Sequence, residues 1–260
     1  MVKNKISNHS LYHFPTSLIR SRSGQSMVEF LVILPVMLLL IFSTIQFALI
    51  FHAKITLNYA AFEAVRYGSL GQGKFDEVKE GFARGLAPLY SYFESDEEIR
   101  KKRKGDVAED QIEAFQIARN KIYDEFDTQN KLVRIERLNP MDSSFLDFSP
   151  DEEIPNNNLM YRSSNIEGKA KTSIQDANLL HLRVTYWYPL YVPLINKLIF
   201  NTFICCKTGE GQNSFCKWGE DPVCMDKDQE PVIPLTATAV MRMQTPLVKS
   251  DGYFDKSQLK

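Results

Sequence analysis

The chain has 260 residues, of which 44% are hydrophobic and 24% are charged, and its formal net charge at pH 7 is −1. This composition is typical of one or two packed domains and excludes an intrinsically disordered chain. Four of the 31 basic residues and no acidic residue lie in the first 24 positions, so the rest of the chain carries 27 basic against 32 acidic residues. That acidic balance argues against binding to nucleic acid.

The chain begins with a short basic leader, residues 1–24, which contains Lys3, Lys5, Arg20 and Arg22. Residues 30–53 then follow without a formal charge. As a helix rising about 1.5 Å per residue they would span roughly 36 Å, which exceeds the hydrocarbon core of a bilayer at about 30 Å. We therefore predict a single transmembrane helix at about 30–53, with the +4 leader in the cytoplasm and the remaining chain outside it.

Other interpretations of this segment stay open. A secretory signal has a core of about 7 to 15 apolar residues and a small-x-small cleavage site, whereas this run is longer and contains Pro35. An uncleaved single-pass anchor has the same hydropathy as a cleaved one. Gly24 and Glu29 alone favour cleavage, because a carboxylate at the edge of the membrane needs a partner. Cleavage after Gly24 would provide one, in the new α-ammonium group of Gln25.

The residues around this point read Gly24-Gln25-Ser26-Met27-Val28-Glu29-Phe30. This segment resembles the cleavage site of type IV prepilins, most closely that of the TadE-like minor pseudopilins of tight-adherence (Tad/Flp) pilus systems. Similar family features recur downstream, at residues 58–67, 137–140, 189–193 and 235–242. The length of the chain and the pair Glu29-Phe30, where major Flp pilins commonly carry Glu-Tyr, fit a minor component of the pilus rather than its bulk subunit.

The resemblance implies cleavage by a prepilin peptidase between Gly24 and Gln25, and pairing of Glu29 with a subunit N-terminus. It implies a protein of the bacterial inner membrane with its head in the periplasm or in an extracellular pilus. Its partners would be other minor pseudopilins, the major Flp pilin and the inner-membrane assembly platform. The implied function is assembly or initiation of an adhesive Flp-type pilus. The alternative is an uncleaved, single-pass periplasmic or surface binding module.

The N-terminal helix is expected to cover residues 25–68, with a kink at Pro35 and an end at Gly68. Its distal half should be amphipathic and lie against a globular head. The predicted stripe consists of Ile55, Tyr59, Phe62 and Arg66.

Residues 69–260 are predicted to form an extracytoplasmic head. A helical pattern covers residues 75–126 and is expected to break at Pro88, and the basic cluster at 100–104 is interpreted as a solvated helix face. A period of two predicts strands at about 132–138, 182–188 and 233–245, with long loops over 141–178. The apolar segment 190–203 is too short to span a membrane and is expected to be core or an interface helix. The fold class is therefore pilin-like α+β, in which the long helix packs on a small antiparallel sheet with additional helices.

The four cysteines cluster in a turn-rich loop at residues 205–224. In an oxidising compartment they predict disulfides, with three possible pairings. A zinc site is the alternative, but the adjacent first pair lacks the usual spacing of two to four residues. The cysteines are Cys205, Cys206, Cys216 and Cys224.

No catalytic motif stands out. Only His52 and His181 would remain after removal of the leader, and neither has a neighbouring nucleophile or carboxylate pattern. The sequence also lacks a Gly-rich phosphate loop and a Gly-x-Ser-x-Gly motif. We predict that the protein is not an enzyme and uses no cofactor or metal ion.

Overall fold

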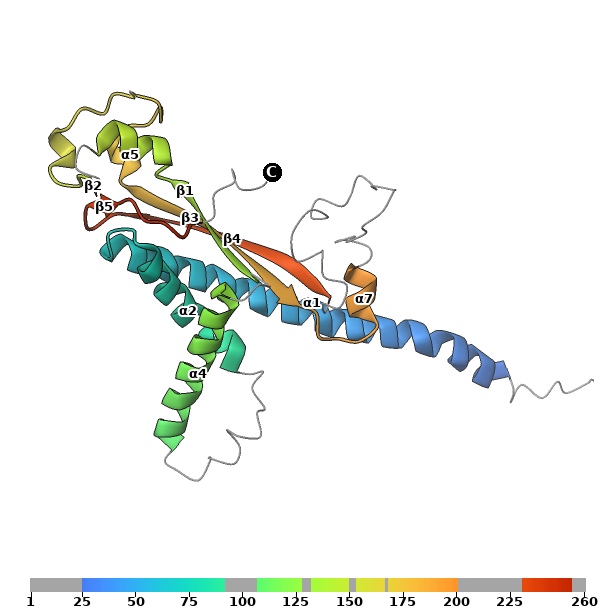
Figure 1. Cartoon of the computed structure of the whole chain (residues 1–260). Helices are drawn as coiled ribbons and strands as arrows, with labels where there is room; N and C mark the ends of the chain where they lie inside the picture. The colour runs from blue at the N-terminus through green and yellow to red at the C-terminus, as the bar shows by residue number, and fades with distance from the viewer. Residues whose placement is uncertain are drawn as a thin grey trace, which may run out of the picture. The chain divides into compact units, whose positions relative to one another are not determined.

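The computed structural model describes residues 25–91, 107–127, 132–149, 153–166, 168–200 and 231–253. The chain divides into two compact units, Met1–Ile41 and Phe42–Lys260. Helix α1 (Gln25–Leu70) contributes its first part to one unit and its remainder to the other. In the second unit α1 is joined by further helices and a small antiparallel sheet, which confirms the predicted α+β class (Figure 1).

Helix α1 is 46 residues long and continues through Pro35. Helix α1 continues two residues past the predicted end at Gly68. Gly68 serves close packing rather than helix termination, because a Cβ at this position would lie 2.6 Å from Val78 Cγ2. The helix ends at Leu70, after which Gln72 and Gly73 take positive φ angles of 61° and 70°. This left-handed conformation is a common helix ending.

The buried face of the distal half of α1 consists mainly of small residues. They are Ala53, Leu57, Ala60, Ala61, Ala64 and Val65. The predicted stripe of Ile55, Tyr59, Phe62 and Arg66 is instead exposed, so the expectation that it faces the head is wrong. The reason is that alanine side chains allow the neighbouring elements to approach the helix axis closely, whereas the larger residues would hold them apart.

The main sheet has the order β1 (Val133–Asn139), β3 (Leu179–Pro189), β4 (Val232–Arg242), and both pairs are antiparallel. These strands confirm the three predicted from a period of two. Along β4, Leu235 and Ala237 are buried while Thr236 and Thr238 are exposed, as the alternation predicts. Beyond β4, the Gln244 N–H donates to Ser69 O at 3.0 Å, which ties the end of the sheet to the end of α1.

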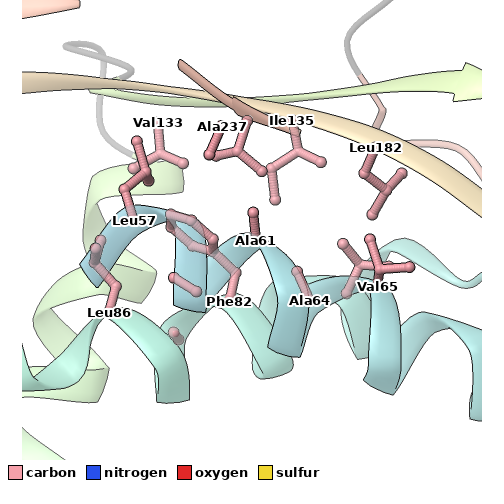
Figure 2. Packing of buried hydrophobic residues seen from close by; sticks show 14 of the residues in the cluster. Leu57, Ala61, Ala64, Val65, Phe82, Leu86, Val133, Ile135, Leu182 and Ala237 are labelled. Atoms are coloured by element: carbon pink, nitrogen blue, oxygen red, sulfur yellow. The ribbon is translucent and has the colours of Figure 1, made fainter. Parts of the chain in front are cut away.

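Helix α2 (Phe75–Ser91) packs on the other side of α1, and α4 (Val107–Asp127) packs on α2. Figure 2 shows Phe82 and Leu86 of α2 on one side of Leu57 and Ala61, with Val133 and other residues of the sheet opposite. The predicted break at Pro88 is wrong. Burial of Leu89 and Tyr90 in the core offsets the backbone hydrogen bond that the proline removes.

Residues 141–178 contain more regular structure than the predicted loops. They form α5 (Asp142–Phe148), β2 (Glu153–Ile154), the 3₁₀ turn η2 (Leu159–Tyr161) and α6 (Ile174–Ala177). β2 pairs antiparallel with β5 (Leu247–Val248). Side-chain hydrogen bonds fix this region. Ser173 caps α6 by accepting from the Asp176 N–H, and Asn178 Nδ2 donates to Pro155 O at 3.1 Å. The last helix among the described residues, α7 (Ile195–Ile199), follows β3.

Candidate functional site

The first turns of α1 hold the residues predicted to direct processing. Gly24 lies outside the described residues, and Gln25 is the first residue of the helix. Glu29 follows in the second turn with an exposed side chain. The apolar residues after it are also exposed, from Phe30 to Ile41 with Leu34 half-buried. Large apolar side chains are thus exposed along this stretch, and α1 is long and apolar enough to cross a membrane.

Further along α1, one polar side chain is completely buried. Gln46 lies within the charge-free run, and its Oε1 accepts a hydrogen bond from the Val192 N–H at 2.9 Å. Gln46 Nε2 is buried and has no hydrogen-bond partner in the part of the chain that the structure describes. Sequence reasoning missed this contact, although Gln46 is the one amide side chain among residues 30–53.

The segment that contacts Gln46 follows β3 and includes α7. Its inward side chains are Leu190, Val192, Ile195 and Ile199, which pack against Phe42, Leu49 and Ile50 of α1 and against Ile233. The Leu190 N–H also donates to Pro231 O at 2.8 Å, which extends the end of the sheet. The prediction that the apolar segment 190–203 contributes to the core is thus confirmed for one face of residues 190–199.

A polar cluster joins α2 to α4 on the other side of the head. Glu80 Oε1 lies 2.6 Å from Arg84 Nε and 3.2 Å from Arg119 Nη1, and its other oxygen accepts from the Tyr123 hydroxyl. Burial alone would raise the pKa of Glu80. The hydrogen bonds from Tyr123 and Arg84 and the charge of Arg119 outweigh burial, so that the pKa of Glu80 lies below its ordinary value. The cluster therefore holds two helices together by charge-assisted hydrogen bonds.

The remaining candidate chemistry is sparse among the described residues. His181 lies on β3, where burial and the neighbouring Arg183 lower its pKa, and His52 is exposed on α1. No group of three or more His, Cys, Asp or Glu side chains in the described ranges could hold a metal ion. A pocket of about 120 Å³ is lined in part by Tyr90 and Tyr186, whose hydroxyl groups form a hydrogen bond of 3.0 Å. Its lining is formed by Leu89, Tyr90, Lys121, Leu132, Tyr186, Pro189 and Tyr191.

The predicted disulfide residues and the basic cluster at 100–104 cannot be placed relative to these elements, because both lie outside the described residues. The candidate features that the structure does describe lie on α1. The junction with the leader is at the start of this helix, and the Gln46 contact lies further along it. The cysteines in question are Cys205, Cys206, Cys216 and Cys224.

Comparison with protein families gives a match in the first part of the chain. Residues 24–66, which begin at Gly24 and extend through the buried alanine face of α1, match the family model described as TadE-like protein. No curated protein and no solved structure matches the chain. Over residues 24–66, this chain is therefore similar to TadE-like proteins.

Proposed function

We propose that the protein is a minor pseudopilin that assembles or initiates a Flp-type adhesive pilus of a tight-adherence system after its leader is removed. The observation that carries the proposal is the family match, which starts at Gly24, the residue predicted to precede the cleaved bond. In this proposal α1 holds the protein in the bacterial inner membrane, and the head lies in the periplasm or enters the pilus. The proposed partners are a prepilin peptidase, other minor pseudopilins, the major Flp pilin and the assembly platform.

The exposed apolar surface of α1 supports an anchoring function. Residues 27–41 place large apolar side chains on all sides of the helix, which is expected of a helix surrounded by lipid or by other apolar helices. Glu29 is the one formal charge between Gln25 and Ala53. In this low-dielectric setting, the α-ammonium group of a neighbouring subunit is the proposed counter-ion.

The N-terminus of the membrane-extracted protein tests the proposal most directly. We expect N-terminal sequencing and intact mass to show a chain that starts at Gln25. Gly24→Leu should retain the 24-residue leader, because a membrane peptidase must bind the extended backbone closely at a residue without bulk. Gly24→Ala is the matched control and should be cleaved at least in part. A wild-type chain that starts at Met1 or Val2 would support the uncleaved binding module instead.

A second experiment tests the proposed pairing of Glu29. Glu29→Gln should leave cleavage largely intact and reduce co-purification with other pilus components, since it removes the charge that a neighbouring N-terminus would balance. Cyclisation of an N-terminal Gln25 would remove that ammonium charge, so the mass of the mature N-terminus must be measured in the same sample. Undiminished co-purification of the variant from an uncyclised sample would contradict the pairing.

A further inference from the structure

We propose that residues 190–199 form a second lipid-contacting element, which inserts apolar side chains into the non-cytoplasmic leaflet beside α1. This inference rests on the proposed function, in which α1 spans the membrane. The head would then be seated partly in the bilayer rather than suspended above it. Figure 1 shows α7 beside α1, well before the end of that helix.

The first argument concerns depth along α1. The predicted transmembrane segment covers residues 30–53, so Phe42, Leu49 and Ile50 lie in its C-terminal half. A hydrocarbon core of about 30 Å that begins near Phe30 therefore includes this stretch in its second half. Because residues 190–199 pack directly on this stretch, they lie at the same depth.

The second argument concerns Gln46. An amide exposed to hydrocarbon is unfavourable, because lipid tails offer it no hydrogen bond. Gln46 is completely buried, and the Val192 N–H donates to its Oε1 at 2.9 Å. The same hydrogen bond satisfies a backbone group of the irregular stretch before α7, as non-helical backbone at membrane depth requires.

The third argument concerns the outward face of this segment. Leu194 is 76% exposed and Leu198 is 52% exposed, although both belong to a segment whose other face is core. Tyr191 and Lys197 are exposed beside them. Leucines next to a tyrosine and a lysine are typical of a membrane interface, where the ring lies at headgroup level and the long lysine stem reaches the phosphates.

The backbone at Leu194 adds to this argument. Its φ of 68° and ψ of −52°, with the Ile195 N–H donating to Pro193 O at 2.8 Å, form the rare γ-turn with positive φ. A leucine is unfavourable in this conformation, and its side chain contributes little to the head because it points outward. Contact with lipid would explain why a leucine occupies this position, whereas packing in the protein core does not explain it.

Lipid fits this surface better than a protein partner because the surface continues that of the transmembrane segment. Phe47 and Phe51 of α1 are exposed in the same stretch that residues 190–199 cover on the other side. A protein partner for α7 alone would leave these phenylalanines at the edge of the bilayer unexplained.

The opposite end of the head provides an internal control. β3 starts near the end of α1, because Leu179 pairs with Arg242 and the following Gln244 N–H donates to Ser69 O. From Gln46 to Ser69 the helix rises roughly 35 Å, and the 11 residues of β3 span about the same length. Met160 and Tyr161 lie near this far end and are each 87% exposed, so they are apolar and accessible but well outside the bilayer.

The experiment uses the full-length protein in vesicles of phosphatidylethanolamine and phosphatidylglycerol that contain a lipid with a photoreactive group in its acyl chain. After illumination, cross-linked sites are mapped by peptide mass spectrometry. We expect labels on α1 between residues 27 and 51 and on residues 191–198, and none on Met160 or Tyr161. Labels on α1 without labels on residues 191–198 would overturn this inference and leave the anchor intact. An unlabelled α1 would contradict the anchor and this inference together, and equal labelling of Met160 and Tyr161 would show that labels follow exposure rather than depth.

Two variants sharpen the test. Leu194→Asn should lose labelling of residues 191–198 while the head stays folded, because asparagine tolerates a positive φ better than leucine does. Leu198→Asp should have the same effect, and Leu146→Asp, which changes a leucine that is 76% exposed on α5, is its matched control. Undiminished labelling of residues 191–198 in both test variants would overturn the inference.

Discussion

At the scale of single residues, two glycines allow α2 to lie against α1. A Cβ on Gly85 would lie 2.5 Å from Ala60 Cα, and one on Gly81 would lie 2.6 Å from Glu63 O. Both neighbours are backbone atoms, which cannot rotate away as a side chain can. The close approach of the two helices therefore depends on the missing side chains at Gly81 and Gly85 and on the small Ala60 that faces Gly85.

Gly85→Ala should destabilise the head. Overpacking of a tight contact costs about 1 to 3 kcal/mol, and the better helix propensity of alanine offsets up to about 1 kcal/mol of this cost. We therefore expect the free energy of unfolding to fall by roughly 1 to 2 kcal/mol. Urea unfolding in detergent micelles measures this loss. Glu77→Ala, at an exposed position of the same helix, should change stability by less than about 0.5 kcal/mol. Equal stability of Gly85→Ala and wild type would contradict the tight packing.

Glu80 makes the α2–α4 contact depend on pH. Its pKa in the folded protein lies below the ordinary value, so its contribution to stability is complete above the unfolded-state pKa and disappears as pH falls through the folded one. Glu80→Gln should therefore lower the free energy of unfolding by about 1 to 3 kcal/mol at pH 7, and this difference should shrink below about pH 4. Urea titrations at pH 7, 5 and 3.5 measure it. Glu77→Gln is the control, and a Glu80→Gln difference independent of pH would refute the ionised contact.

At the scale of elements, the sequence predicted the features that depend on local patterns. The alternation along β4 placed Leu235 and Ala237 correctly because a strand turns successive side chains to opposite faces. Pro88 and the stripe through Tyr59 were misjudged because tertiary packing decided them. In the candidate site, the motif from Gly24 to Phe30 is local and could be recognised. The contact between Gln46 and Val192 joins residues 146 positions apart, and no local pattern indicates it.

Gln46→Leu should loosen residues 190–199 without unfolding α1. It removes the acceptor of the Val192 N–H, and a net hydrogen-bond contribution of about 0.5 to 1.5 kcal/mol corresponds to amide exchange about twofold to twelvefold faster. Hydrogen–deuterium exchange with mass spectrometry on peptides covering 190–199 measures this change. Phe47→Leu, at the adjacent exposed position, is the control and should leave exchange in that segment unchanged. Unaltered protection in Gln46→Leu would show that the hydrogen bond does not hold the segment.

At the scale of the whole molecule, α1 combines two tasks that differ in the surface they require. Between residues 30 and 41 it is apolar on all sides, whereas from Ala53 onward one face is a close-packed core contact. Under the proposed function, α1 therefore serves as an anchor in its first part and as a core helix of the head in its second. Under the proposed topology, the basic leader fixes the compartment of everything that follows α1, including the cysteine-rich loop.

That topology predicts the redox state of the cysteines. With the head in the periplasm, Cys205, Cys206, Cys216 and Cys224 should be oxidised in the native protein, because they are even in number, closely spaced and in an oxidising compartment. Reduction should destabilise the head by roughly 2 to 5 kcal/mol, as the loss of a structural disulfide does in small extracytoplasmic regions. Thiol labelling under denaturing, non-reducing conditions measures the oxidation state, with a reduced sample as the control for complete labelling. Labelling of all four cysteines in the native sample, together with stoichiometric zinc, would favour a thiolate metal site and contradict the disulfides. Because thiolates bind zinc only while reduced, that result would also count against a periplasmic head.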